Sequence, residues 1–167
     1  MSSLASNTVY MTLNSRGMPG TFHWGVFVTS SPPRGQYYHA TNKFGGWQLE
    51  AKPSSNVLSS LSLVLVYRIG SLSSQAGRLD QVLRAVPANG SASLRTGEAF
   101  TCRIWAKDAL MALHNSGIVT LSASIDKLEK QAFALARRLE TKIESGEGKA
   151  SVLDSDPSSS SSSSRRR

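Results

Sequence analysis

The stretch FHWGVFVT, residues 22–29, decides the fold of this chain. Its large apolar side chains, Phe22, Trp24, Val26 and Val28, recur at every second position and would lie on one face of a strand. His23 falls on the opposite face, together with the glycine and phenylalanine that follow it at the same spacing. The alternation therefore predicts a strand that presents a histidine on one side and an apolar surface on the other.

Further strands are predicted on both sides of this stretch, separated by segments that contain Gly and Pro. Residues 36–41 and 47–52 would complete an antiparallel meander with residues 22–29. The Val/Leu-rich run that ends at Gly70 is typical of a buried strand. In all, strands are expected at residues 9–13, 22–29, 36–41, 47–52 and 61–69, with a further short strand at 118–121.

Three segments have helical patterns. A helix is expected at residues 76–86, where Pro87 would end it. A second helix would begin after a candidate N-cap at Thr101 and end at Gly117. The longest, at residues 124–144, repeats its apolar residues at helical spacing. The expected fold class is α+β: an antiparallel sheet of four to five strands, packed by the helix that carries Cys102 and by the long C-terminal helix.

Length and composition indicate one folded domain followed by a tail. The 167 residues, of which 40% are hydrophobic, suffice for one domain with its own core, expected over residues 1–145. Residues 146–167 are Ser-rich with a basic end and are expected to be a disordered tail. The net charge of +8 favours solubility, and a weak contact with an anionic partner through Arg165–Arg167 is the alternative.

Cys102 is the only cysteine, and it stands at the expected start of a helix. Partial positive charge and unpaired N–H groups at a helix N-terminus suit a nucleophilic thiol. His23 could act as its base, and His39, on a neighbouring strand, could orient His23. Asn42 and Gln48 are weaker alternatives for the orienting group. A structural cysteine and ordinary strand histidines are the simpler interpretation of each residue alone. No paired spacing of metal ligands and no phosphate-binding loop is present, so no metal or cofactor is expected.

The order of these landmarks resembles the circularly permuted papain-like fold of NlpC-type and lecithin–retinol acyltransferase-like proteins. The segment HWGVFV at residues 23–28 is similar to that family's first histidine strand, His39 matches its second polar position, and FTCRIW at residues 100–105 is similar to its cysteine segment. Thr101 replaces the Asn that commonly precedes the cysteine. The resemblance covers residues 20–115 and extends to uncharacterised fungal proteins that share the landmarks. It implies Cys102 as nucleophile, His23 as base and His39 as orienting group.

We therefore expect a thiol-dependent hydrolase or acyltransferase that acts on an amide, ester or thioester of an unknown acyl or peptide substrate. The alternative is a non-catalytic binding or effector-like module on the same scaffold. The N-terminal residues show no signal peptide, the most apolar stretch, at residues 61–69, is too short to span a membrane as a helix, and a single cysteine provides no internal disulfide. A cytoplasmic location is expected, with a nuclear one as the alternative.

Overall fold

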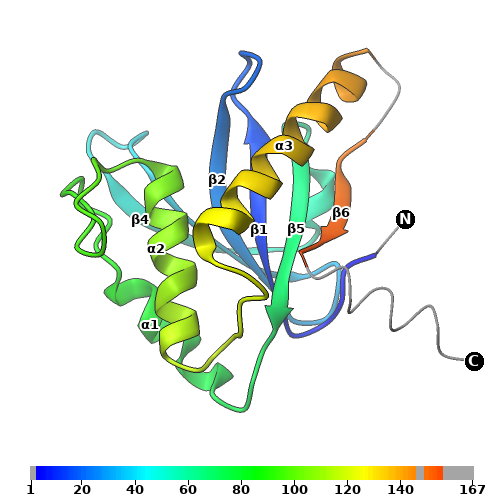
Figure 1. Cartoon of the computed structure of the whole chain (residues 1–167). Helices are drawn as coiled ribbons and strands as arrows, with labels where there is room; N and C mark the ends of the chain where they lie inside the picture. The colour runs from blue at the N-terminus through cyan, green and yellow to red at the C-terminus, as the bar shows by residue number, and fades with distance from the viewer. Residues whose placement is uncertain (1–2, 146–148, 156–167) are drawn as a thin grey trace, which may run out of the picture.

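The computed structural model describes residues 3–145 and 149–155 (Figure 1). The strands are β1 (Thr8–Ser15), β2 (Phe22–Thr29), β3 (Gly35–Thr41), β4 (Gln48–Ser54), β5 (Leu63–Ser71) and β6 (Ser151–Asp154). The helices are α1 (Leu79–Ala85), α2 (Cys102–Asn115) and α3 (Ile125–Glu144), and the short 3-10 turns are η1 (Val57–Ser59) and η2 (Ala76–Arg78).

The strands form one sheet in the order β4-β3-β2-β1-β5-β6. Neighbouring strands are antiparallel, except for the parallel pair β5 and β6. The predicted α+β class is confirmed, with α2 packed on β2 and β3 and the long helix α3 packed on β5 (Figure 1). The sheet has six strands where four to five were expected, because residues 151–154 add a strand beside β5.

The two faces of the sheet carry separate apolar clusters. The face that packs against α2 and α3, here called the helix face, includes Trp24, Val26, Tyr38 and Ala40. The opposite face, here called the η1 face, is covered by the turn η1 and packs Tyr10, Phe27, Leu63 and Val66 with Val57. Because side chains on a strand alternate between faces, the assignments on β2 and β3 place His23, Gly25, Tyr37 and His39 on the η1 face.

Local sequence signals explain where the two long helices begin and end. The hydroxyl of Thr101 accepts a hydrogen bond from the N–H of Ile104 at 3.1 Å, and Ser124 accepts one from Lys127 at 3.2 Å. Both residues are N-caps, as their hydroxyls allow. Gly117 follows α2 with a positive φ of 73°, a conformation that suits glycine at a helix C-terminus.

The strand predicted at residues 118–121 does not form. The N–H of Ile118 instead donates to the carbonyl of Leu113, which completes the C-terminal turn of α2. Ile118 and Val119 are buried in the core of the helix face, so their apolar character reflects packing after the helix and not a strand ladder. The prediction of a strand here was wrong for that reason.

The C-terminal segment also differs from the prediction of a disordered tail. Residues 151–154 pair with β5, and Val152 is buried in the cluster of the η1 face. Arg165–Arg167, the predicted anionic contact, lie outside the described residues. Within residues 3–145 and 149–155, no helix has the length and apolar character needed to cross a membrane.

Candidate functional site

Two histidines and a glutamate form a hydrogen-bonded series on the η1 face. His23 Nε2 lies 2.6 Å from His39 Nδ1, and His39 Nε2 lies 2.6 Å from Glu50 Oε1. His23 comes from the start of β2, His39 from the end of β3, and Glu50 from the position on β4 directly opposite His39. The structure thus brings together the two histidines whose faces the strand alternation predicted to be in register.

The carboxylate determines how protons are arranged along this series. Because Glu50 can only accept, His39 Nε2 carries a hydrogen, and His39 Nδ1 then accepts from His23 Nε2–H. This arrangement leaves a lone pair on His23 Nδ1, to which no other described residue hydrogen-bonds. The series therefore presents an unprotonated imidazole nitrogen whose orientation is set by two hydrogen bonds behind it.

Burial and neighbouring charges keep both imidazoles neutral. Burial, then the charges of His39 and Arg16, lower the pKa of His23 to about 4. Burial also lowers the pKa of His39, against the opposing effect of Glu50. Burial opposes ionisation of Glu50, but hydrogen bonds from His39 and Lys43 hold its pKa below the ordinary value. At neutral pH His23 is therefore an unprotonated imidazole supported by neutral His39 and ionised Glu50, with a nitrogen free to accept a proton but less basic than that of an ordinary histidine.

Tyr37 encloses the series on the same face. Its ring is stacked on that of His39, with centroids 4.7 Å apart. Its hydroxyl lies over Gly25, where any added Cβ would be only 2.6 Å from the oxygen. A glycine in the middle of β2 is therefore required for Tyr37 to lie across the strand. Burial raises the pKa of Tyr37 to about 12, so its hydroxyl remains protonated at neutral pH.

Cys102 lies on the other side of the sheet. Its side chain is 4% exposed and belongs to the core of the helix face, beside residues of β2 and α2. Arg16 Nη1 donates to its sulfur at 3.7 Å, and no hydrogen bond joins the sulfur to His23 or His39 among the described residues. The Cys102 sulfur thus packs on the helix face, whereas strand alternation places His23 on the η1 face, and both residues lie at the end of the sheet where β2 begins.

A cavity of about 470 Å³ opens on the η1 face beside His23. Its wall is formed by β1, the end of β4 and the segment that carries η1, and it presents serine hydroxyls and asparagine amides among apolar surface. The lining residues are Asn14, Ser15, His23, Tyr37, Lys52, Pro53, Ser54, Asn56, Val57, Ser59, Ser60, Ser62 and Leu63. A polar ligand in this cavity would contact the imidazole that ends the series.

Glu50 was missed in the sequence, where Asn42 and Gln48 were the alternatives considered for an orienting group. Neither of those side chains hydrogen-bonds a histidine in the described structure. The pairing of the β3–β4 hairpin would have identified Glu50. Thr41 pairs with Gln48, so Glu50, two residues further along β4, lies opposite His39. His114, the third histidine, accepts a hydrogen bond from Leu121 N–H at 3.1 Å and anchors the segment after α2.

The described residues contain no group of three His, Cys, Asp or Glu side chains that could hold a metal ion. No curated protein and no solved structure matches the chain. A family match covers residues 9–120, from β1 to the segment after α2, and so includes His23, His39, Glu50 and Cys102. The chain belongs to this family, the family of unknown function DUF6540.

Proposed function

We propose that the chain is an acyl-transfer enzyme, a hydrolase or acyltransferase of an amide, ester or thioester, in which His23 is the acid–base group. The observation that carries the proposal is the Glu50–His39–His23 series, which ends at a cavity. A carboxylate that orients an imidazole, which in turn activates a nucleophile, is the general arrangement of such catalysts. Here a second imidazole stands between the carboxylate and the base.

The chemistry follows from the proton arrangement. His23 Nδ1 accepts the proton of an attacking thiol or water as that atom bonds to the carbonyl carbon of the substrate. The positive charge that develops on His23 is stabilised through His39 by the carboxylate of Glu50. The same nitrogen then returns the proton to the leaving amine, alcohol or thiol, which restores the neutral imidazole.

Cys102 is the nucleophile expected from the sequence and from the papain-like resemblance. A guanidinium at 3.7 Å and the N-terminus of a 14-residue helix both attract an anionic sulfur, which supports this role. Its position on the helix face argues for water as the alternative nucleophile. A reducing compartment such as the cytoplasm is part of the proposal, because the free thiol would persist there.

Hydrolysis of p-nitrophenyl acetate and of an S-acetyl thioester tests the proposal in four variants. We expect His23→Gln to lower kcat/KM by about 10²- to 10⁴-fold, the usual contribution of a general base. Glu50→Gln should lower it by a smaller factor, whereas Glu98→Gln, a change at an exposed glutamate outside the series, should leave it unchanged. Loss of activity in Cys102→Ser assigns the thiol, and full activity assigns water. Equal activity in the wild type and His23→Gln would reject the proposal.

A second candidate function is favoured by one observation, the burial of Cys102 in apolar packing. A thiol in such a position is a small core residue, and the fold would then serve as a binding module whose ligand occupies the cavity beside His23. Iodoacetamide alkylation of the folded protein separates the two. A sulfur that reacts only after unfolding, in a chain without hydrolytic activity, would favour the binding module.

A further inference from the structure

Three loops lie at the end of the sheet where β1 and β3 end and β2, β4 and β5 begin, and each carries an exposed apolar side chain. Met18, in the β1–β2 loop, is 67% exposed, and Phe44, in the β3–β4 turn, is 59% exposed. Leu61, before β5, is 100% exposed. These three residues are here called the apolar tips. Large apolar side chains this exposed, gathered at one end, are typical of an interaction surface.

Packing at this end holds the loops in place. Gly17, Leu61 and Ile143 line one hollow, so the loop of Met18, the segment of Leu61 and the end of α3 are neighbours. The N–H of Gly20 donates to Glu140 at 3.1 Å, and the N–H of Ser15 donates to the carbonyl of Ser62 at 2.8 Å. Met18 and Leu61 are thus presented by segments that are fixed to the domain.

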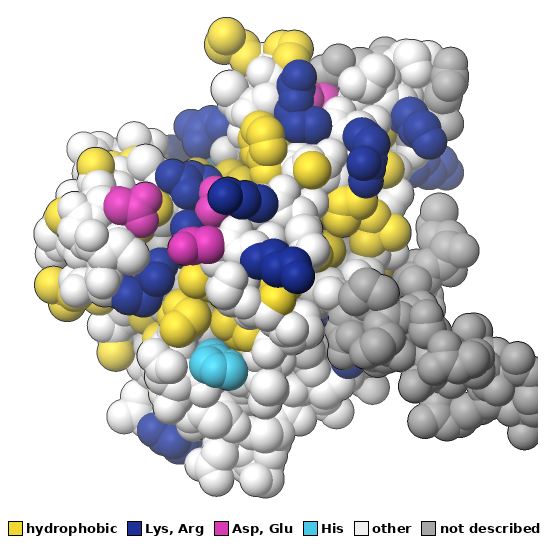
Figure 2. All heavy atoms as spheres, in the orientation of Figure 1, with side chains coloured by type: hydrophobic (Ala, Val, Ile, Leu, Met, Phe, Trp, Pro, Cys, Tyr) yellow, Lys and Arg dark blue, Asp and Glu magenta, His cyan; other side chains and the backbone are white. Residues whose placement is uncertain are grey.

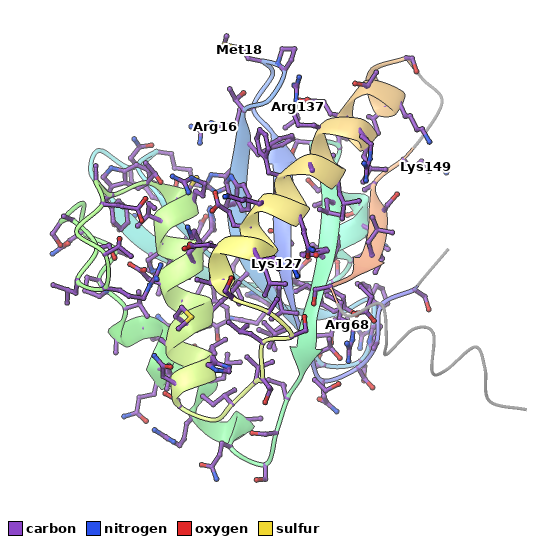
Figure 3. All side chains as sticks on the ribbon, viewed as in Figure 1. Arg16, Met18, Arg68, Lys127, Arg137 and Lys149 are labelled. Atoms are coloured by element: carbon purple, nitrogen blue, oxygen red, sulfur yellow. The ribbon has the colours of Figure 1, made fainter. Side chains whose placement is uncertain are left out.

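Positive charge lies beside Met18 and along the end of α3. Figure 3 shows Arg16 and Arg137 near Met18, and Lys149 beyond the same end of α3. Arg16, Lys142 and Lys149 form no ion pair with any described residue. Glu140, an acid at this end of the molecule, is bonded to Arg137 at 3.0 Å and to Gly20. Figure 2 shows the Lys and Arg side chains on this part of the surface, with apolar atoms at the upper edge.

The charge continues along α3, whose exposed residues include Lys127, Lys130, Arg137, Arg138 and Lys142. The described acids of this helix, Asp126, Glu129 and Glu140, are engaged in ion pairs. The outer surface that leads to the apolar tips is therefore cationic, and its complement is an anionic surface.

We propose that this end of the molecule docks on an anionic membrane surface. The cations would lie among the lipid headgroups, and the apolar tips would enter the region between headgroups and acyl chains. A nucleic acid would satisfy the cations but gives no reason for a fully exposed leucine and a largely exposed methionine at the loop tips. The inference is independent of the proposed function, because it uses neither the histidine series nor Cys102 as a reacting group.

Flotation with phosphatidylcholine vesicles, with and without phosphatidylserine, tests the inference on the full chain. We expect binding only to the vesicles that contain phosphatidylserine, and weakening with added salt. Met18→Ser and Leu61→Ser should each weaken binding by about tenfold, since each removes one inserted side chain. Lys142→Gln with Lys149→Gln should weaken it further and reduce the salt dependence.

Leu94→Ser is the matched control. Leu94 is 87% exposed, like Leu61, but it lies near α1 and the end of α2, away from the apolar tips. This variant should bind vesicles as the wild type does. Absence of binding to anionic vesicles, binding that the tip variants leave unchanged, or equal losses in Leu94→Ser and Leu61→Ser would each overturn the inference. So would binding to a single-stranded RNA oligonucleotide under conditions in which the vesicles are not bound.

Discussion

His23 couples the stability of the fold to pH. Burial is the main reason that its pKa in the folded chain is about 4, whereas an unperturbed histidine has a value of about 6.5. Between these values the unfolded chain binds more protons than the folded chain. The free energy of unfolding must therefore fall as the pH is lowered from about 6.5 towards 4, and His23 contributes no pH dependence above that window. The pKa of His39 is lowered as well and acts in the same direction.

We expect His23→Gln to lose less stability than the wild type as the pH is lowered through this window, because the variant has no buried imidazole to protonate at that position. Urea unfolding at a series of pH values measures the difference. The two proteins should have parallel pH profiles above about pH 7. Identical profiles between pH 4 and 6.5 would show that His23 is not buried in its neutral form.

At this scale the sequence predicted part of the site. Alternation along residues 22–29 and 36–41 put His23 and His39 on one face, and the structure has them hydrogen-bonded. Glu50 required the register of the β3–β4 hairpin, which depends on the exact length of its turn. The placement of Cys102 on the helix face depends on the side of the sheet on which α2 packs, a long-range property that no local pattern contains.

At the scale of elements, the N-cap of α2 provides a direct test. The Thr101 hydroxyl satisfies the N–H of Ile104 at the start of the helix that carries Cys102. Thr101→Ala should lower the free energy of unfolding by about 1 kcal/mol, the usual cost of removing such a cap. Thr101→Ser keeps the hydroxyl and should lower it much less. Chemical denaturation measures both, and equal losses would show that the methyl group, and not the hydroxyl, is the important part of Thr101.

Elements with strong local signals were predicted well. The strands at residues 22–29 and the helix at 124–144 have clear alternation or helical spacing, and both form close to the expected bounds. The failures are elements defined by distant partners. Residues 118–121 are apolar because they fill the core, and β6 exists because β5 offers an unpaired edge to the SVLD segment. Neither fact can be read from a short window of sequence.

At the scale of the whole molecule, β6 ties the C-terminal segment to the domain. Val152 is buried on the η1 face, and Arg68 Nη1 lies 3.4 Å from Asp154 Oδ1. A chain that ends at residue 145 loses this strand and exposes the edge of β5. We expect its melting temperature to fall clearly, since burial of one valine alone contributes about 1.5–3 kcal/mol.

A chain that ends at residue 156 keeps β6 and serves as the control. Its melting temperature should match that of the full chain in thermal unfolding followed by circular dichroism. Equal melting temperatures for the chains that end at 145 and 156 would show that β6 adds nothing to stability. Truncation after residue 156, and not at 146, is accordingly the way to test an anionic contact through Arg165–Arg167 without disturbing the sheet.

Cys102 packs on the helix face of the sheet and His23 lines the cavity on the η1 face. This placement suggests a way to engineer a new thiol beside His23. The β1 residue directly opposite His23 is Asn14, which lies on the same face and lines the same cavity. A cysteine introduced there by Asn14→Cys, in a chain that also carries Cys102→Ser, would have its Cβ about 4.5–5.5 Å from that of His23. We expect iodoacetamide to alkylate this cysteine at a rate that drops when His23 is also replaced. The cysteine at position 14 would then form a thiol–imidazole pair with His23 without any change of the backbone.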